Sequence, residues 1–148
     1  MTVTTLERAV VAAEVMSSPV AVLDEASSIW QAGDLMLGRR IRHVVVVSGS
    51  RCIGVLTDRD LLEAWHRGPA ALRETPVRRL VPTRTSCVLP DATIQQVAHL
   101  MNLNLVDAIP VVTEAGQPLG IVTAGDLVHA IAVHGVSSAN ETVEVAPT

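Results

Sequence analysis

Apolar and polar positions follow one another along the chain in a pattern that predicts the order strand, helix, strand, strand, helix. Residues 43–48 form a nearly unbroken apolar run, HVVVVS, which is typical of a strand covered on both faces. Ser28 precedes a segment whose apolar side chains recur at i, i+3, i+4 and i+7, the spacing of a helix that buries one face. We therefore expect strands at residues 20–23, 43–48 and 52–57 and helices at residues 28–36 and 58–66.

The same order recurs in the second half of the chain. The segment GVLTDRD at residues 54–60 is matched by GIVTAGD at residues 120–126, and 120 − 54 equals 66. Several motifs repeated in the same order imply two similar units that pack together. The repeat predicts strands at residues 86–89, 108–113 and 119–123 and helices at residues 93–102 and 124–133.

Each unit alone has too few elements to bury its own apolar faces. We therefore expect an α/β (α+β) fold in which two tandem β-α-β-β-α units pack through their sheets with pseudo-two-fold symmetry. The expected division is a first repeat with an N-terminal helix (1–68), a second repeat with its connector (69–135) and a flexible tail (136–148). Thr4 and Glu7 have the spacing of a capping box that opens the N-terminal helix.

Six apolar helix positions would be exposed to solvent in an isolated repeat. They either close the core of one molecule or are covered in a homodimer, which is the interpretation we favour. These positions are Leu35, Leu61, Leu62, Leu100, Leu127 and Val128.

Composition narrows the class of protein. The net charge of −4 over 148 residues argues against a general nucleic-acid binder, which needs a basic surface. No apolar run approaches the roughly 18 residues of a membrane span, and residues 1–14 lack the order of a secretory signal, so we expect a cytoplasmic protein. Cys52 and Cys87 are the only cysteines and lack partners at zinc-ligand spacing. We interpret both as small buried thiols and expect no metal site.

The duplicated motifs resemble those of the cystathionine β-synthase (CBS) domain family, in a tandem pair known as a Bateman module. The resemblance covers about residues 10–134 and rests on both Gly-h-h-Thr-x-x-Asp closings, where h is apolar. It also rests on MSSPV at residues 16–20, LPDATI at 89–94, RHVVVV at 42–47 and AIPVV at 108–112. It implies a regulatory module that binds an adenine nucleotide or related adenosyl ligand in a cleft between the repeats. Candidate ligands are AMP, ADP, ATP, NAD and S-adenosylmethionine, and a regulated enzyme or transporter is the implied partner.

The closing motif has a physical rationale of its own. Thr57 and Thr123 stand where a strand gives way to a helix, whose free N–H groups favour an anion. Asp60 and Asp126, three residues later, can accept hydrogen bonds from the hydroxyls of a sugar. Capping of the helix alone would select the same residue types, so both interpretations stay open.

The two clefts are expected to differ in charge. The first repeat carries Arg42 and His43 just before its middle strand, with Arg59 nearby, and the resemblance places phosphate-holding residues there. The second repeat has Asp107 at this place, and a carboxylate repels phosphate. We hypothesise that a cleft of Thr57, Asp60, Arg42 and His43 binds the ligand better than the cleft of Thr123 and Asp126.

Catalysis is not expected. The five histidines are scattered, and the chain has neither a Gly-x-Ser-x-Gly elbow nor a phosphate loop ending in Lys-Ser/Thr. The leading hypothesis is a non-catalytic sensor. The alternative is a structural homodimeric interaction protein with empty clefts.

Overall fold

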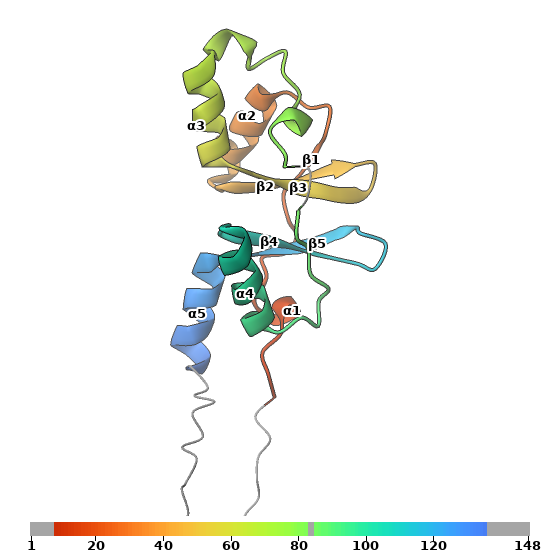
Figure 1. The fold of residues 1–148 in the computed structure, drawn as a ribbon, viewed down its shortest axis with the longest axis vertical. Coiled ribbons are helices and arrows are strands. Elements are labelled where there is room, and N and C mark those ends of the chain that lie inside the picture. Colours follow the sequence, from red (N-terminus) through yellow and green to blue (C-terminus); the bar gives the residue numbers. More distant parts are fainter. Residues whose placement is uncertain (1–7, 83–84, 136–148) are drawn as a thin grey trace, which may run out of the picture.

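The structure, a computed structural model, describes residues 8–82 and 85–135 and stacks two similar repeats sheet against sheet (Figure 1). The first repeat contains β1 (Val22–Asp24), α2 (Ile29–Arg39), β2 (His43–Ser48), β3 (Arg51–Thr57) and α3 (Asp58–Arg67). The second contains α4 (Ile94–Asn104), β4 (Ala108–Val112), β5 (Pro118–Thr123) and α5 (Ala124–His134). Three short helices complete the described chain: α1 (Ala12–Val15), η1 (Pro69–Ala71) and η2 (Val77–Arg79).

Strand β2 is covered on both faces, which confirms the interpretation of its apolar run. Val44 and Val46 pack against the helices of the first repeat, whereas Val45 and Val47 lie between the two sheets. Ala108 and Ile121 of the second repeat meet Val45 and Val47 in this middle layer. The sheets therefore face each other, the helices lie on the outside (Figure 1), and the expected fold class is confirmed.

The segment that precedes each repeat packs on the other repeat. Ala12 of α1 is fully buried in the core of the second repeat, and its N–H donates to the Ala92 carbonyl at 2.7 Å. Val77 of η2 is fully buried in the core of the first repeat, and its N–H donates to the Ser27 carbonyl at 2.7 Å. This reciprocal exchange gives the molecule its pseudo-two-fold character.

Two equivalent glycines allow these crossing segments to approach. A Cβ atom at Gly120 would lie 2.8 Å from the Ser17 carbonyl oxygen, and one at Gly54 would lie 2.1 Å from Cγ1 of Val81. Real side chains do not come this close. A glycine is therefore required at both positions for the crossing segments to approach this closely.

Two expected elements differ in the structure. The strand expected at residues 86–89 is reduced to a single bridge between Val88 and Val111, because Pro90 has no N–H with which to extend the ladder. Over residues 8–11 the expected N-terminal helix is not formed, because Val10 and Val11 pair instead with the start of α4. Thr4, Glu7 and the expected tail lie outside the described residues.

The expected apolar helix faces are mostly covered within the molecule. Leu35 and Leu61 pack against the core of the first repeat, and Leu100 and Leu127 pack against that of the second. Leu62 of α3 and Val128 of α5 remain 68% and 66% exposed. Among the described helices, none combines the length and apolar character that a membrane crossing requires.

Candidate functional site

A cavity of about 560 Å³ opens at the boundary between the repeats, and we call it the basic cavity. Its volume lies within the roughly 300–1,000 Å³ of small-molecule sites. One wall comes from the first half of the chain, with Ser17, residues 19–21, Arg39 and residues 41–43, and the other from Asp107, Ile121 and residues 123–125 of the second repeat. A ligand in this cavity would touch both repeats at once.

The second corner, residues 123–126, forms one end of the basic cavity. Thr123 caps α5: its Oγ1 accepts the Asp126 N–H at 3.3 Å, and the Asp126 Oδ2 accepts the Thr123 N–H at 2.7 Å. Thr123 also lines the cavity, whereas Asp126 does not. Thr123 and Asp126 therefore cap α5, and Thr123 also borders the cavity.

The first corner, residues 57–60, has the same capping box and an additional carboxylate. Thr57 and Asp60 cap α3, with the Thr57 N–H donating to Asp60 Oδ2 at 2.8 Å. Asp58 Oδ1 accepts the Arg59 N–H at 2.9 Å, so a negative charge already occupies this helix N-terminus. None of these four residues lines the basic cavity.

The equivalent positions in the second corner carry no acid. Ala124 stands where Asp58 stands and Gly125 where Arg59 stands, since 124 − 58 and 125 − 59 both equal 66. Ala124 has no side-chain oxygen with which to accept the Gly125 N–H, and both residues line the basic cavity. The start of α5 therefore presents a backbone N–H and the positive end of a helix dipole to the cavity.

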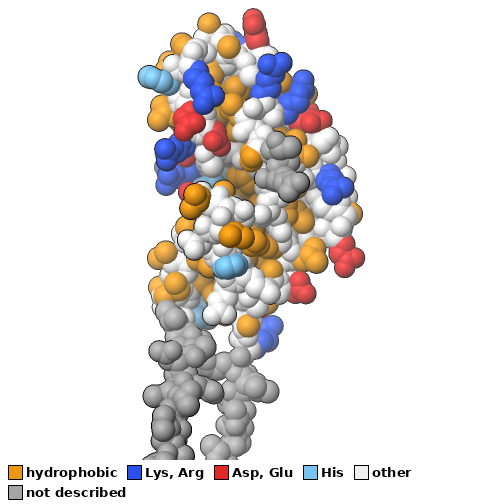
Figure 2. All heavy atoms as spheres, in the orientation of Figure 1, with side chains coloured by type: hydrophobic (Ala, Val, Ile, Leu, Met, Phe, Trp, Pro, Cys, Tyr) orange, Lys and Arg blue, Asp and Glu red, His pale blue; other side chains and the backbone are white. Residues whose placement is uncertain are grey.

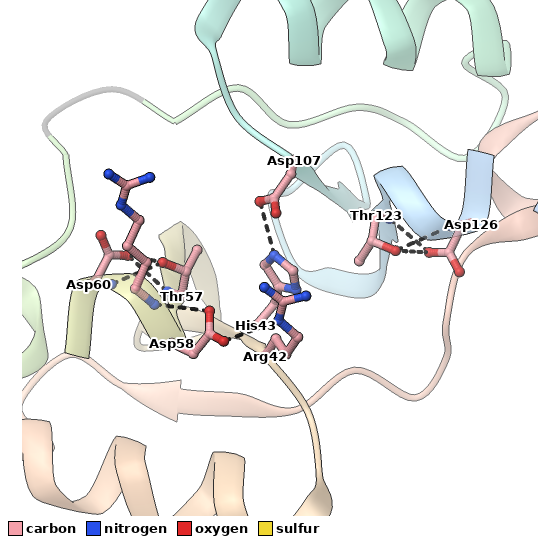
Figure 3. Close-up of polar contacts among 9 residues, drawn as sticks. Arg42, His43, Thr57, Asp58, Asp60, Asp107, Thr123 and Asp126 are labelled. Atoms are coloured by element: carbon pink, nitrogen blue, oxygen red, sulfur yellow. Dashed lines mark hydrogen bonds and ion pairs between the residues drawn. The ribbon is translucent and has the colours of Figure 1, made fainter. Parts of the chain in front are cut away.

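Arg39 and Arg42 give the opposite wall its positive charge, and His43 lies on the same wall. Figure 3 shows His43 reaching toward Asp107 of the second repeat, with Nε2 and Oδ1 3.0 Å apart. His43 can reach across because it alternates with Val45 and Val47 on the face of β2 that points to the other sheet. Its side chain is 13% exposed, whereas that of Arg42 is 74% exposed and pairs with Asp58 Oδ2 at 3.1 Å.

These contacts correct the grouping expected from the sequence. Arg42 and His43 lie in one cavity with Thr123, not in a cleft with Thr57 and Asp60. Asp107 lines this same cavity as the partner of His43. The physical reason is the stacking of the repeats, which places the middle strand of one beside the strand-to-helix corner of the other.

Arg59 also lies apart from the basic cavity. It pairs with Glu63 one turn along α3 at 3.4 Å, and its side chain is 85% exposed. Its expected part in binding phosphate has no support from this geometry.

A second cavity of about 300 Å³ is the pseudo-symmetric counterpart, and we call it the neutral cavity because none of the described residues that line it is charged. Asn104 and Ala108 line it at the positions equivalent to Arg39 and His43, 65 residues on. The difference follows from the sequence, because all 11 basic residues are arginines at or before position 84. Figure 2 accordingly shows Arg side chains gathered over the first repeat.

Sequence reasoning missed Ala124 and Gly125 as candidate binding residues. The only available signal was a difference between the two repeats, TDRD at residues 57–60 against TAGD at residues 123–126. This difference points to a binding role only once the structure shows that residues 123–125 face the arginine-bearing wall of the cavity. Within the described residues, no group of three or more His, Cys, Asp or Glu side chains could hold a metal ion.

Comparisons with known proteins identify the fold. The family model described as CBS domain matches residues 11–67 and 76–133. The CBS domain pair of protein MJ0100, solved in complex with 5′-methylthioadenosine and S-adenosyl-L-methionine, superposes with a TM-score of 0.75 at 20% identity, covering 86% of this chain and 99% of that one. The CBS domain protein PAE2072 from Pyrobaculum aerophilum, complexed with AMP, has a TM-score of 0.76 at 21% identity, with coverages of 85% and 98%.

A curated relative is much longer than this chain. Homoserine O-acetyltransferase of Methanococcoides burtonii is 28% identical over 116 residues, which cover 78% of this chain and 23% of that protein. The match therefore spans about a quarter of that enzyme and leaves most of its length without a counterpart in this chain.

Proposed function

This chain belongs to the CBS domain family, and we propose that it is a non-catalytic regulatory module that binds a phosphorylated adenosine in the basic cavity. The observation that carries the proposal is the composition of this cavity. An arginine-bearing wall from the first repeat lies opposite Ala124 and Gly125, the first two residues of α5, which carry no acid, while the capping Asp126 does not line the cavity.

The apolar part of the cavity suits a nucleobase. Pro19, Val20, Ala21, Ile41 and Ile121 line it, and flat apolar surfaces of this kind bury a planar ring without requiring polar partners. The proteins MJ0100 and PAE2072, which share the fold, were solved with adenosyl ligands, and this supports an adenosyl compound here.

The polar part of the cavity suits a phosphate. Arg39 and Arg42 supply guanidinium donors, Thr123 a hydroxyl and Gly125 a backbone N–H. Asp107 also lines the cavity, with its Oδ1 3.0 Å from His43 Nε2. We therefore expect AMP, ADP or ATP to bind more tightly than uncharged adenosine, since a hydrogen bond to a charged group contributes about 1.5–3 kcal/mol.

Calorimetric titration with AMP and with adenosine tests this proposal. We expect one AMP per chain and at least about tenfold weaker binding of adenosine. A thermal-shift panel of AMP, ADP, ATP, NAD and S-adenosylmethionine extends the test, because a ligand at 100 times its dissociation constant stabilises the folded state by about 2.7 kcal/mol. If none of the five raises the melting temperature, the alternative of a structural protein with empty clefts is favoured.

Regulation would follow from the position of the ligand between the repeats. A ligand that touches both walls favours the packing state in which the walls are correctly spaced, and the shift can be no larger than its difference in affinity for the two states. We propose that this change is passed to a partner enzyme or transporter.

We further propose a homodimer that buries the outer faces of α3 and α5. Leu62 and Val128, at 68% and 66% exposure, are the members of the expected apolar faces that the molecule itself does not cover. Figure 1 places α3 and α5 on the same side of the molecule, so one flat partner surface can cover both.

A further inference from the structure

The two cysteines of this chain meet across the boundary between the repeats. They are 35 residues apart in sequence, and their Sγ atoms are 3.9 Å apart. A disulfide bond requires about 2.05 Å, so the two sulfurs must approach by about 2 Å. Both side chains are half-buried, which leaves them reachable by small oxidants.

The backbone on each side of this pair is already held in place. Cys52 lies in β3, and its N–H donates to the Gly116 carbonyl in the second repeat at 2.8 Å. Cys87 directly precedes Val88, which bridges to β4 through two backbone hydrogen bonds. Thr85 reaches back to β3, with its Oγ1 donating to the Ile53 carbonyl at 3.2 Å. These contacts keep the two sulfurs near each other in the folded chain.

We expect the two thiols to differ in reactivity. The Cys87 thiol donates a hydrogen bond to Cys52 Sγ, and this contact lowers the pKa of Cys52, while the same contact and burial raise the pKa of Cys87. Because the thiolate is the nucleophile, Cys52 reacts first and Cys87 keeps its proton until the second step.

We propose that Cys52 and Cys87 are a redox modification site, which a peroxide closes into a reversible disulfide that joins the two repeats. The Cys52 thiolate attacks hydrogen peroxide, the O–O bond breaks, and Cys52 becomes a sulfenic acid with release of hydroxide. The Cys87 sulfur then attacks the Cys52 sulfur, the S–S bond forms, and the hydroxyl leaves with the Cys87 proton as water. The first hydroxide takes the proton lost by Cys52, so two thiols are oxidised and one peroxide becomes two waters.

The disulfide would tie together two walls of the neutral cavity. Ser86, next to Cys87, lines one wall, and Val55, on the same strand as Cys52, lines another. The inference does not depend on ligand binding in the basic cavity, and it is tested without any nucleotide.

The site is tested by equilibrating the chain in glutathione redox buffers. Free thiols are then alkylated under denaturing conditions, and the intact mass is measured. We expect the folded chain to form a monomeric disulfide two hydrogen atoms lighter, at least about tenfold more readily than the same chain in concentrated urea. Hydrogen peroxide should give the same product, with a melting temperature raised by about 5–10 °C and restored by a dithiol.

Single variants separate this site from nonspecific oxidation. Cys52→Ser and Cys87→Ser should show no rise in melting temperature on oxidation, and dimedone should label Cys52 in the Cys87→Ser chain faster than Cys87 in the Cys52→Ser chain. The proposal is overturned if the folded wild-type chain gives mainly glutathione adducts or interchain disulfides. It is equally overturned if the disulfide forms less readily in the folded chain than in the chain unfolded in urea.

Discussion

Replacing Ala124 by Asp should give the second corner the additional carboxylate that the first corner carries at Asp58. In the first corner, Asp58 Oδ1 accepts the Arg59 N–H at 2.9 Å. Because Ala124 and Gly125 hold the equivalent positions, the new carboxylate should accept the Gly125 N–H in the same way. It would then stand at the end of the basic cavity where we place the phosphate.

The expected effect on binding follows from Coulomb's law. Two unit charges about 5 Å apart in a medium of effective dielectric constant about 20 repel each other by about 3 kcal/mol. This corresponds to about 150-fold weaker AMP binding at low salt, and to less as salt screens the pair. The fold should survive, because an acid in the first turn of a helix stabilises it by about 0.3–1 kcal/mol.

Calorimetric titration of three chains separates charge from shape. Ala124→Asn is the matched control, since its amide oxygen can accept the Gly125 N–H without a charge. We expect Ala124→Asp to lose AMP affinity while keeping its affinity for adenosine, and Ala124→Asn to keep most of both. Equal losses of AMP and adenosine in Ala124→Asp, or no loss of AMP, would refute the placement of the phosphate.

Four further substitutions test the site, the fold and the assembly. Arg42→Ala should weaken AMP binding about tenfold in calorimetry while leaving adenosine unaffected, and an unchanged AMP affinity would remove Arg42 from the site. Gly120→Ala should lower the free energy of unfolding in urea by about 1–3 kcal/mol, because its Cβ would lie 2.8 Å from the Ser17 carbonyl oxygen. Gly38→Ala, with nothing within 4 Å in α2, should raise that free energy by about 0.5–1 kcal/mol, and equal effects of the two would contradict the close approach at Gly120. Leu62→Glu should shift sedimentation toward monomer, whereas an unchanged dimer would place the interface elsewhere.

Local patterns predicted most of the secondary structure. The Val run of β2 has the composition of a two-sided strand, and alternate residues do pack on opposite faces. The helix ends were harder to predict. The residues that follow α2 and α4, Arg40 and Leu105, have φ of 53° and 54°. This left-handed conformation is usually adopted by Gly or Asn, so residue type carried no stop signal there.

The sequence suggested candidate site residues by type, but it did not predict which of them lie together. Arg42, His43 and Thr123 line one cavity only because the repeats stack face to face, and no local pattern encodes which corner faces which strand. The duplicated motif predicted two equivalent corners, but not that Asp58 occupies one helix N-terminus while Ala124 leaves the other open. Packing between segments distant in sequence, rather than secondary-structure propensity, determines which corner faces which strand.

The most direct test is an AMP titration followed by amide resonances in ¹H–¹⁵N NMR. Gly125 and Arg59 are the matched pair, since they hold the same place in the two corners and only Arg59 donates to a neighbouring carboxylate. We predict a large, saturable shift of the Gly125 amide and little change at Arg59. A saturable shift at Arg59 with none at Gly125, or none at either, would contradict binding in the basic cavity.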